Sequence, residues 1–322
     1  MAEGEQPALA WLRSRLGRVR LPWRAAAVEA RPAIAVVTDS AAALPPEWAA
    51  AFAADRRLTV VPMPVMVGEE IFGEGEDDIG ETISLALAAG KPVRTSRPSP
   101  GQFEAAYRAA EVAGFAGIVS AHLSADLSGT VEAARLAASR VGIPVEVVDT
   151  RTVGMAQGFG VQAAVLAAAA GMGLDDVARL CRRQVDATKV LFYVPSLEQL
   201  RRGGRVGAAA SWIGTVFAIK PILAVEGGIV VPLERVRTVP RAVARLKELA
   251  AERLAQLPPE RARLAVHHFG NQPQAQELLD ELVAAGPSGV EAQLSRLPAV
   301  LAAHAGLGVL VVVTAEAVLP GD

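Results

Sequence analysis

Hydroxyl-bearing side chains gather in two turns, each of which follows an expected strand and precedes an expected helix. The first turn spans residues 95–100 and reads Thr-Ser-Arg-Pro-Ser-Pro, and the second spans residues 122–130 and reads His-Leu-Ser-Ala-Asp-Leu-Ser-Gly-Thr. In open α/β sheets, ligands bind beyond the carboxyl ends of the strands, where helix N-termini present unpaired N–H groups. A single Ser or Thr at such a place is typically a helix N-cap. Two such turns at one crevice instead favour a binding site for a carboxylate.

A serine nucleophile is the alternative chemistry for the second turn. Ser124 or Ser128 would attack and His122 would act as the base, because His122 and Ser124 are two apart on extended chain. The sequence places no carboxylate to orient His122, and Ser128 serves equally well as a cap. The chain also lacks a Gly-x-x-x-x-Gly-Lys-Ser/Thr phosphate loop and the Gly-x-Gly-x-x-Gly, His-Glu-x-x-His and Gly-x-Ser-x-Gly motifs. A serine-dependent acyl hydrolase or transferase therefore stays an alternative.

The sequence contains few residues that could bind a metal ion or a cofactor. The sequence has one cysteine, Cys181, and four histidines, namely His122, His267, His268 and His304. His267 and His268 end an expected strand, so their rings point to opposite faces of a sheet and do not share a metal ion. A single cysteine excludes an internal disulfide, and its helical surroundings make Cys181 a packing residue. We therefore expect no metal site and no cofactor.

The composition excludes further classes of function. The formal net charge of the 322 residues is −2, whereas a nucleic-acid-binding protein needs a basic field. Two uncharged stretches, residues 152–174 and 297–314, are long enough to be compared with a membrane span. Glutamines and glycines in the first stretch favour a buried helix, and the apolar run at 309–313 is typical of a central strand in a parallel sheet. We expect no transmembrane segment and a cytoplasmic location.

The two hydroxyl-rich turns must be positioned by the strands and helices around them. Strands and helices alternate from residue 33 onward, and this alternation predicts a parallel sheet with right-handed crossovers. The expected strands are residues 34–37, 58–67, 118–121 and 145–148, and the expected helices begin near residues 46, 83, 101 and 131. Pro62 and Pro64 make the stretch 58–67 an edge strand or an irregular one.

After residue 149 the pattern changes. Two helices are expected at 158–170 and 174–187, followed by a strand at 190–194 and by a hairpin whose strands, 222–225 and 229–235, flank Glu-Gly-Gly. A long helix at 239–256, a strand at 264–267, a helix and two further strands complete the chain. The predicted fold is α/β with two lobes and a cleft between them: an N-terminal parallel lobe over 33–151 and a C-terminal mixed lobe over 152–322.

Residues 1–32 are expected to form an extension ahead of the folded unit. Tryptophan and leucine alternate there with arginine, and a basic amphipathic helix could make transient contact with an anionic membrane surface. Gly17 and Pro22 interrupt such a helix, so a flexible tail is the favoured interpretation.

Five short motifs follow one another in order along the chain. They read Thr-Asp-Ser at 38–40, Thr-Ser-Arg-Pro-Ser at 95–99, Leu-Ser-Gly-Thr at 127–130, Leu-Glu-Gln-Leu-Arg-Arg-Gly-Gly-Arg at 197–205 and Ile-Lys-Pro-Ile at 219–222. In this order they resemble the motifs of the DegV family of bacterial fatty-acid-binding proteins. The resemblance covers the chain from about residue 33 to the C-terminus.

The resemblance implies a non-catalytic protein that buries the tail of a long-chain fatty acid in a tunnel between the lobes. Thr95 and Ser128 match the positions that hold the carboxylate. His304, which aligns with a histidine in the family's His-Thr-Gly-Pro-Gly stretch, would lie beside the carboxylate, although the stretch here reads His-Ala-Gly-Leu-Gly. Further candidates for head-group contact or partner docking are Ser96, Arg205 and Asp39.

The resemblance also implies a partner, a separate fatty acid kinase that supplies ATP and forms an acyl phosphate. The missing phosphate loop agrees with this division of labour. Burial of about fourteen methylenes at ~0.8 kcal/mol each is favourable by on the order of 11 kcal/mol before ordering costs. Hydrogen bonds to a carboxylate add roughly 1.5–3 kcal/mol each, so the tail would supply affinity and the head group orientation. A lipid-responsive regulatory protein without a kinase is a further alternative.

Overall fold

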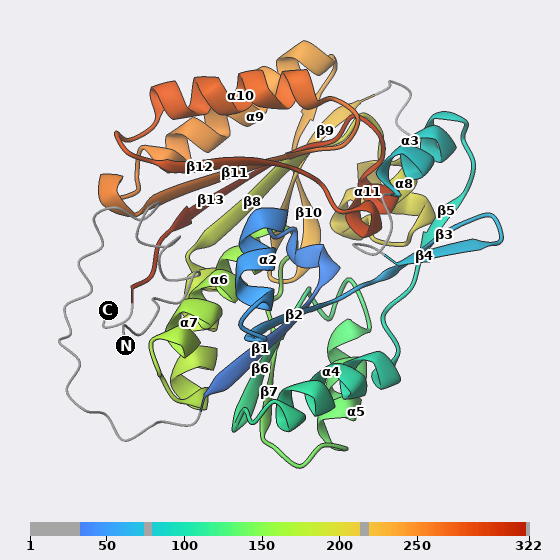
Figure 1. Cartoon of the computed structure of the whole chain (residues 1–322). Coiled ribbons are helices and arrows are strands. Elements are labelled where there is room, and N and C mark those ends of the chain that lie inside the picture. Colours follow the sequence, from blue (N-terminus) through green and yellow to red (C-terminus); the bar gives the residue numbers. More distant parts are fainter. Residues whose placement is uncertain (1–32, 74–78, 213–218, 320–322) are drawn as a thin grey trace.

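The structure is a computed structural model that describes residues 33–73, 79–212 and 219–319. The expected extension over residues 1–32, with its proposed membrane contact, lies outside the described residues. The described chain has an α/β fold with two lobes, each built on its own sheet (Figure 1). The predicted fold class is therefore confirmed.

The first lobe contains a sheet of four parallel strands in the order β2-β1-β6-β7. Its strands are β1 (Ile34–Asp39), β2 (Leu58–Val61), β6 (Gly117–His122) and β7 (Val145–Asp149). The central strands β1 and β6 are buried along their whole length because helices cover both faces of the sheet. One face is covered by α4 (Pro100–Val112) and α5 (Thr130–Ala138), and the other by α2 (Pro46–Ala53), α6 (Met155–Ala169) and α7 (Leu174–Asp186).

The second lobe contains a mixed sheet of six strands in the order β10-β9-β8-β13-β11-β12. Its strands are β8 (Thr188–Tyr193), β9 (Lys220–Glu226), β10 (Ile229–Val236), β11 (Ala262–His268), β12 (Glu291–Arg296) and β13 (Leu310–Glu316). Its outer face is covered by α9 (Val239–Leu254) and α10 (Gln272–Ala285). β9 and β10 form the hairpin that the sequence predicts.

The prediction for β13 is correct in position and wrong in direction. β13 is central, but it runs antiparallel to both of its neighbours, β8 and β11. One face of β13 packs with α9 and α10. The other face is buried in the hydrophobic core between the lobes. Burial on both faces requires a continuous apolar run whichever way the neighbouring strands point, so the pattern does not distinguish the two directions.

The stretch 58–67 was expected to be one edge or irregular strand and is two strands in different sheets. β2 is the edge strand of the first sheet, whereas β3 (Pro64–Val67) pairs antiparallel with β4 (Glu70–Gly73) and β5 (Val93–Thr95). Pro62 separates them, because proline has no N–H with which to continue a ladder. Thr95 is the last residue of β5, and β5 contacts α3 (Gly80–Ala88).

Helix α6 lies between the two sheets and contacts strands of both (Figure 1). Gln162, Leu166 and Ala169 are its only residues that are not buried. The buried helix predicted for the uncharged stretch 152–174 is therefore confirmed. Because α6 and α7 pack on the first sheet, we propose that the first lobe extends through α7. No helix in the described ranges is both long and apolar enough to cross a membrane.

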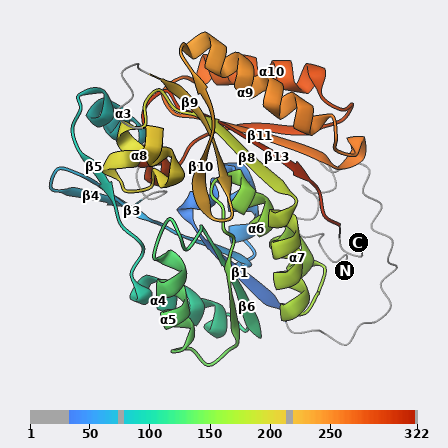
Figure 2. The ribbon, with the colours of Figure 1, turned by 180° about the vertical axis from the view of Figure 1, so that it is seen from behind.

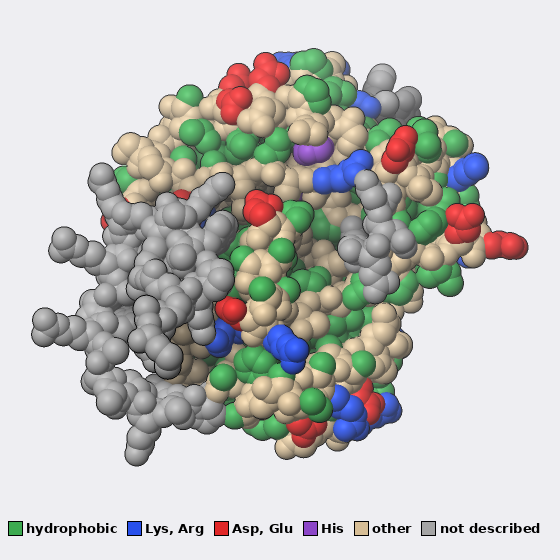
Figure 3. Space-filling view, in the orientation of Figure 1, with side chains coloured by type: hydrophobic (Ala, Val, Ile, Leu, Met, Phe, Trp, Pro, Cys, Tyr) green, Lys and Arg blue, Asp and Glu red, His purple; other side chains and the backbone are tan. Residues whose placement is uncertain are grey.

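Short helices complete the described chain. They are α8 (Glu198–Arg202), α11 (Ala299–Ala305) and the 3-10 helices η1 (Ser40–Ala42), η2 (Gly207–Trp212) and η3 (Pro259–Arg261). On the face shown in Figure 3, acidic and basic side chains are interspersed among hydrophobic ones. No single basic field extends over that face, in line with the composition.

Candidate functional site

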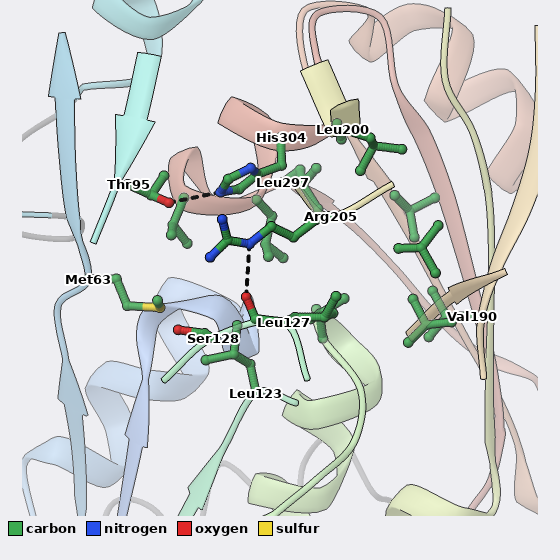
Figure 4. A pocket seen from close by; sticks show the side chains of 18 of the residues that line it. Met63, Thr95, Leu123, Leu127, Ser128, Val190, Leu200, Arg205, Leu297 and His304 are labelled. Atoms are coloured by element: carbon green, nitrogen blue, oxygen red, sulfur yellow. Dashed lines mark hydrogen bonds between the residues drawn. The ribbon is translucent and has the colours of Figure 1, made fainter. Parts of the chain in front are cut away.

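A cavity of about 430 Å³ lies between the lobes, which is within the range of roughly 300–1,000 Å³ that is usual for small-molecule sites. Its apolar walls come from both lobes: Met63, Leu123 and Leu127 from the first, and Val190, Phe192, Val225, Val230, Leu297 and Val311 from the second. Its polar lining residues are Thr95, Ser96, Arg97, Ser128, Arg205 and His304. Figure 4 shows Thr95, Ser128, Arg205 and His304 toward one end and Val190 toward the other. The volume and lining suit a long apolar molecule with a polar head.

Thr95 and His304 form the central contact of the polar end. The Thr95 hydroxyl oxygen lies 2.8 Å from Nε2 of His304 (Figure 4). Burial, with a smaller contribution from the charge of Arg205, lowers the pKa of His304 to about 4. The imidazole is therefore neutral at pH 7, with one ring nitrogen as donor and the other as acceptor. If Nε2 carries the proton and donates to Thr95, the hydroxyl proton of Thr95 is left to donate to a ligand.

The capping roles in the two turns belong to neither Thr95 nor Ser128. Ser99 caps α4, because its hydroxyl accepts from the Gln102 N–H at 3.3 Å and the Gln102 side chain accepts from the Ser99 N–H at 2.9 Å. At α5 the N-cap position is a glycine, and the Ser128 hydroxyl lies 2.8 Å from the Thr130 hydroxyl instead. The capping interpretation therefore does not account for Thr95 or Ser128. Ser128 also lies just before the N-terminus of α5, where the helix dipole favours an anion.

Arg205 connects the two lobes at the polar end. Its Nε donates to the Leu127 carbonyl at 3.0 Å, and its guanidinium also donates to the Gly203 carbonyl. Leu127 opens the Leu-Ser-Gly-Thr turn, so the Gly-Gly-Arg motif of the second lobe contacts the hydroxyl turn of the first. Within the described ranges, no carboxylate pairs with Arg205. Its positive charge is therefore open to a ligand.

Asp39 lies outside the cavity lining, although the sequence made it a candidate for head-group contact or docking. Its carboxylate is fully buried and accepts from His122 Nδ1 at 2.9 Å and from the Leu123 N–H at 3.2 Å. It also accepts from the Ala41 N–H at 3.0 Å. Asp39 therefore holds the beginning of the second turn against the end of β1.

Among the described residues, the His122 ring hydrogen-bonds to neither of the serines considered as nucleophiles. Its Nε2 bonds the Ser120 hydroxyl at 2.7 Å. Ser120, His122 and Asp39 thus have the connectivity of a catalytic triad, but all three are fully buried and none lines the cavity. Ser124 instead donates to the Gly228 carbonyl at 2.7 Å. The geometry gives no support to a serine-dependent reaction.

The tip of the β9–β10 hairpin is held on the first lobe (Figure 2). Ser124 and the Arg151 guanidinium donate to the carbonyl groups of Gly228 and Gly227. Because Val225 and Val230 of this hairpin line the cavity, these contacts close one of its walls. Serine at position 124 is thus a structural link between the lobes.

The residues considered for metal chemistry do not assemble. Among the residues that the structure describes, no group of three or more His, Cys, Asp and Glu side chains could hold a metal ion. Burial raises the pKa of the Cys181 thiol to about 12. A buried, protonated thiol is a packing residue rather than a nucleophile.

Two residues of the polar end were not identified from the sequence. Arg97 occupies the variable position of the Thr-Ser-x-Pro-Ser motif and lines the cavity. Gly203 packs against His304, and a Cβ built at Gly203 would clash with Nδ1 of the imidazole. A charged residue inside a hydroxyl-rich turn was the available signal for Arg97, whereas the contact of Gly203 follows only from the tertiary fold.

Comparisons with known proteins agree with this architecture. Residues 33–317 match the family model described as "Uncharacterised protein, DegV family". A DegV domain-containing protein of Streptomyces coelicolor is 42% identical over 284 residues, which are 88% of this chain and 98% of that protein. The protein DegV of Bacillus subtilis is 32% identical over 280 residues, which are 86% of this chain and 97% of that protein.

Two solved structures are similar at the level of the whole fold. One shows fatty acid binding of a DegV family protein from Thermus thermophilus, with a TM-score of 0.79 and 30% identity over 88% of this chain and 99% of that one. The other is DegV of Bacillus subtilis, a fatty acid binding protein, with a TM-score of 0.78 and 30% identity over the same shares. By the extent of the family match and the identity to these relatives, the chain belongs to the DegV family.

Proposed function

We propose that this protein binds one long-chain fatty acid, with the tail in the cavity between the lobes and the carboxylate at Thr95, Ser128 and His304. The observation that carries the proposal is the Thr95–His304 pair at the polar end of an otherwise apolar cavity. The fatty acid binding of the Thermus and Bacillus relatives supports the same ligand class. The two hydroxyls supply donors that are not engaged in helix capping, and the neutral imidazole orients the Thr95 hydroxyl.

The arrangement supports a carrier that performs no chemistry of its own. The head group lies at the end where Ser96 and Arg97 are exposed, so a bound carboxylate would be the part of the ligand nearest to solvent. Presentation to a separate fatty acid kinase, which forms the acyl phosphate, fits this placement and the missing phosphate loop. We expect Arg205 of the second lobe to lie beside the head group and to contact the partner kinase.

The test combines binding with phosphoryl transfer. The purified protein loaded with hexadecanoate is mixed with a purified fatty acid kinase and ATP, and acyl phosphate is trapped as the hydroxamate. We expect acyl phosphate only when both proteins are present. Arg205→Ala should lower transfer more than it lowers hexadecanoate affinity. Arg202→Ala is the matched control, since Arg202 is an exposed arginine of the same motif outside the cavity lining.

Three outcomes would contradict parts of the proposal. Absence of hexadecanoate binding contradicts the ligand assignment. Binding without acyl-phosphate formation contradicts the carrier role and favours a lipid-responsive regulatory protein. Turnover of acyl esters by the protein alone contradicts the non-catalytic assignment.

A further inference from the structure

Two arginines contact the turn that carries Ser128 at the polar end of the cavity. Arg205 donates through Nε to the Leu127 carbonyl at 3.0 Å. Arg97 packs against Gly129, where an added Cβ would clash with its Nη1 and would lie 3.2 Å from its Cδ. Leu127 and Gly129 are the immediate neighbours of Ser128 in the turn. Two arginines from different lobes therefore contact the residues on either side of Ser128, and both line the cavity together with it.

The positive charge at this end exceeds what one carboxylate neutralises. The ionisable side chains in the cavity lining are Arg97, Arg205 and His304. His304 is neutral at pH 7 because its pKa is about 4, so the two arginines give the lining a formal charge of +2. Among the described residues, no carboxylate forms an ion pair with either arginine. The nearby Asp126 carboxylate faces the hairpin, where an added Cβ on Gly228 would lie 2.7 Å from Oδ2.

We propose that Arg97 makes the polar end selective for a terminal phosphate dianion on a long aliphatic chain, so that the protein binds a phosphorylated head group more tightly than the fatty acid. A phosphate has the charge and the three oxygens to engage two guanidinium groups at once, whereas a carboxylate offers one charge and two oxygens. This inference rests on the proposed function, in which the acyl phosphate is formed on the bound acid. The protein would then hold the reactive acyl phosphate after transfer, with its tail still buried.

The test compares two ligands of equal chain length, hexadecanoate and hexadecyl phosphate, by titration calorimetry at pH 7.5. The wild-type protein should prefer the phosphate. Arg97→Gln should weaken hexadecyl phosphate binding by roughly five- to tenfold, the range for a charge-assisted contact of an exposed side chain after solvent screening. Hexadecanoate binding should change by less than about twofold, because the Thr95 and Ser128 hydroxyls already supply the donors for a carboxylate.

Arg94→Gln is the matched control for the loss of one positive charge. Arg94 is exposed on the same strand as Thr95 and is absent from the cavity lining. Because successive residues of a strand point to opposite faces, its side chain faces away from the site. This variant should leave both affinities unchanged.

Lowering the pH provides a second readout. The second pKa of a phosphate monoester is about 6, so hexadecyl phosphate carries one charge at pH 5. The loss of hexadecyl phosphate affinity caused by Arg97→Gln should then be smaller than at pH 7.5, and an undiminished loss would contradict recognition of the dianion. His304 stays largely neutral at this pH, because its pKa is about 4.

The outcomes separate this inference from the proposed function. No binding of hexadecanoate by the wild-type protein contradicts the proposed function. Normal hexadecanoate binding without a preference for the phosphate contradicts the selectivity alone. Equal loss of affinity for both ligands in Arg97→Gln would show that Arg97 supports the site without discriminating between head groups.

Discussion

The hydroxyl of Thr95 and the imidazole of His304 are 2.8 Å apart, although 209 residues separate them in the chain. Thr95 ends β5 of the small three-stranded sheet, and His304 lies in α11 of the second lobe. α11 contacts both β3 and β5. The polar end of the site therefore forms only when the small sheet packs on α11.

Gly203 makes the position of His304 sterically possible, which predicts a contrast between two neighbouring glycines. Gly203 has φ −77°, so alanine is conformationally acceptable there, but its Cβ would clash with Nδ1 of His304. Gly203→Ala should displace the imidazole and weaken hexadecanoate binding by roughly 1–3 kcal/mol, the value of a head-group hydrogen bond. Gly204 has φ +71° and open space around it, so Gly204→Ala should lower the free energy of unfolding by about 1–2 kcal/mol and leave affinity nearly unchanged. Equal affinities of the two variants would contradict this role of Gly203.

Thr95 and Ser128 should act on one head group. Thr95→Val and Ser128→Ala should each weaken hexadecanoate binding by roughly 1–3 kcal/mol, and the double variant should show a coupling free energy of at least ~0.5 kcal/mol. Both losses should be smaller for hexadecanol, which carries no charge. Affinities come from titration calorimetry, and thermal melts of the same variants report stability. Strictly additive losses would mean that the two hydroxyls do not share a ligand.

The apolar walls of the cavity predict a strong dependence on chain length. Shortening the acid from sixteen to eight carbons removes methylenes worth ~0.8 kcal/mol each, so affinity should fall by several kcal/mol. Val311→Phe, which adds volume to the cavity wall, should weaken hexadecanoate binding more than octanoate binding. Similar affinities for both acids in the wild-type protein would exclude a buried tail.

His267 should make the fold sensitive to acid. Its Nε2 accepts from the Met155 N–H at 3.1 Å, and its Nδ1 lies 2.9 Å from the Ser295 hydroxyl. Burial is the main cause that lowers the pKa of His267 from 6.5 to about 4. Between these values the unfolded chain binds a proton that the folded protein does not, so the free energy of unfolding falls as pH decreases from about 6.5 to 4.

Urea denaturation at several pH values checks this prediction. His267→Gln keeps an acceptor for the Met155 N–H and has no group that titrates. Between pH 7 and pH 5, the free energy of unfolding should decrease in both proteins. The decrease should be smaller in His267→Gln than in the wild-type protein by on the order of 1–2 kcal/mol. Parallel pH profiles for the two proteins would show that another group causes the acid sensitivity.

Local patterns predict most elements of the fold, and their failures have physical reasons. The apolar runs of β1 and β6 and the uncharged helix α6 are recognisable because full burial leaves no choice of residue type. The direction of β13 is not recognisable, since a strand covered on both faces has the same pattern in a parallel or an antiparallel sheet. The small sheet was missed because its strands contain only four, four and three residues.

The sequence indicates several residues that line the cavity, but not the contacts between them. The ordered motifs indicated Thr95, Ser128 and Arg205, the family's histidine-containing stretch indicated His304, and all four line the cavity. The partner of His122 was not predictable, because Asp39 reaches it only through the pairing of β1 with β6. The same holds for Gly203, whose contact with His304 joins α8 to α11.

The most direct test of the central claim is native mass spectrometry of the protein as purified, followed by titration of the delipidated protein with hexadecanoate. We expect a mass increment equal to one long-chain fatty acid per chain, and saturable uptake of one equivalent of hexadecanoate after delipidation. A protein that carries no acyl ligand and takes up no hexadecanoate after delipidation would contradict the assignment of this cavity to a fatty acid.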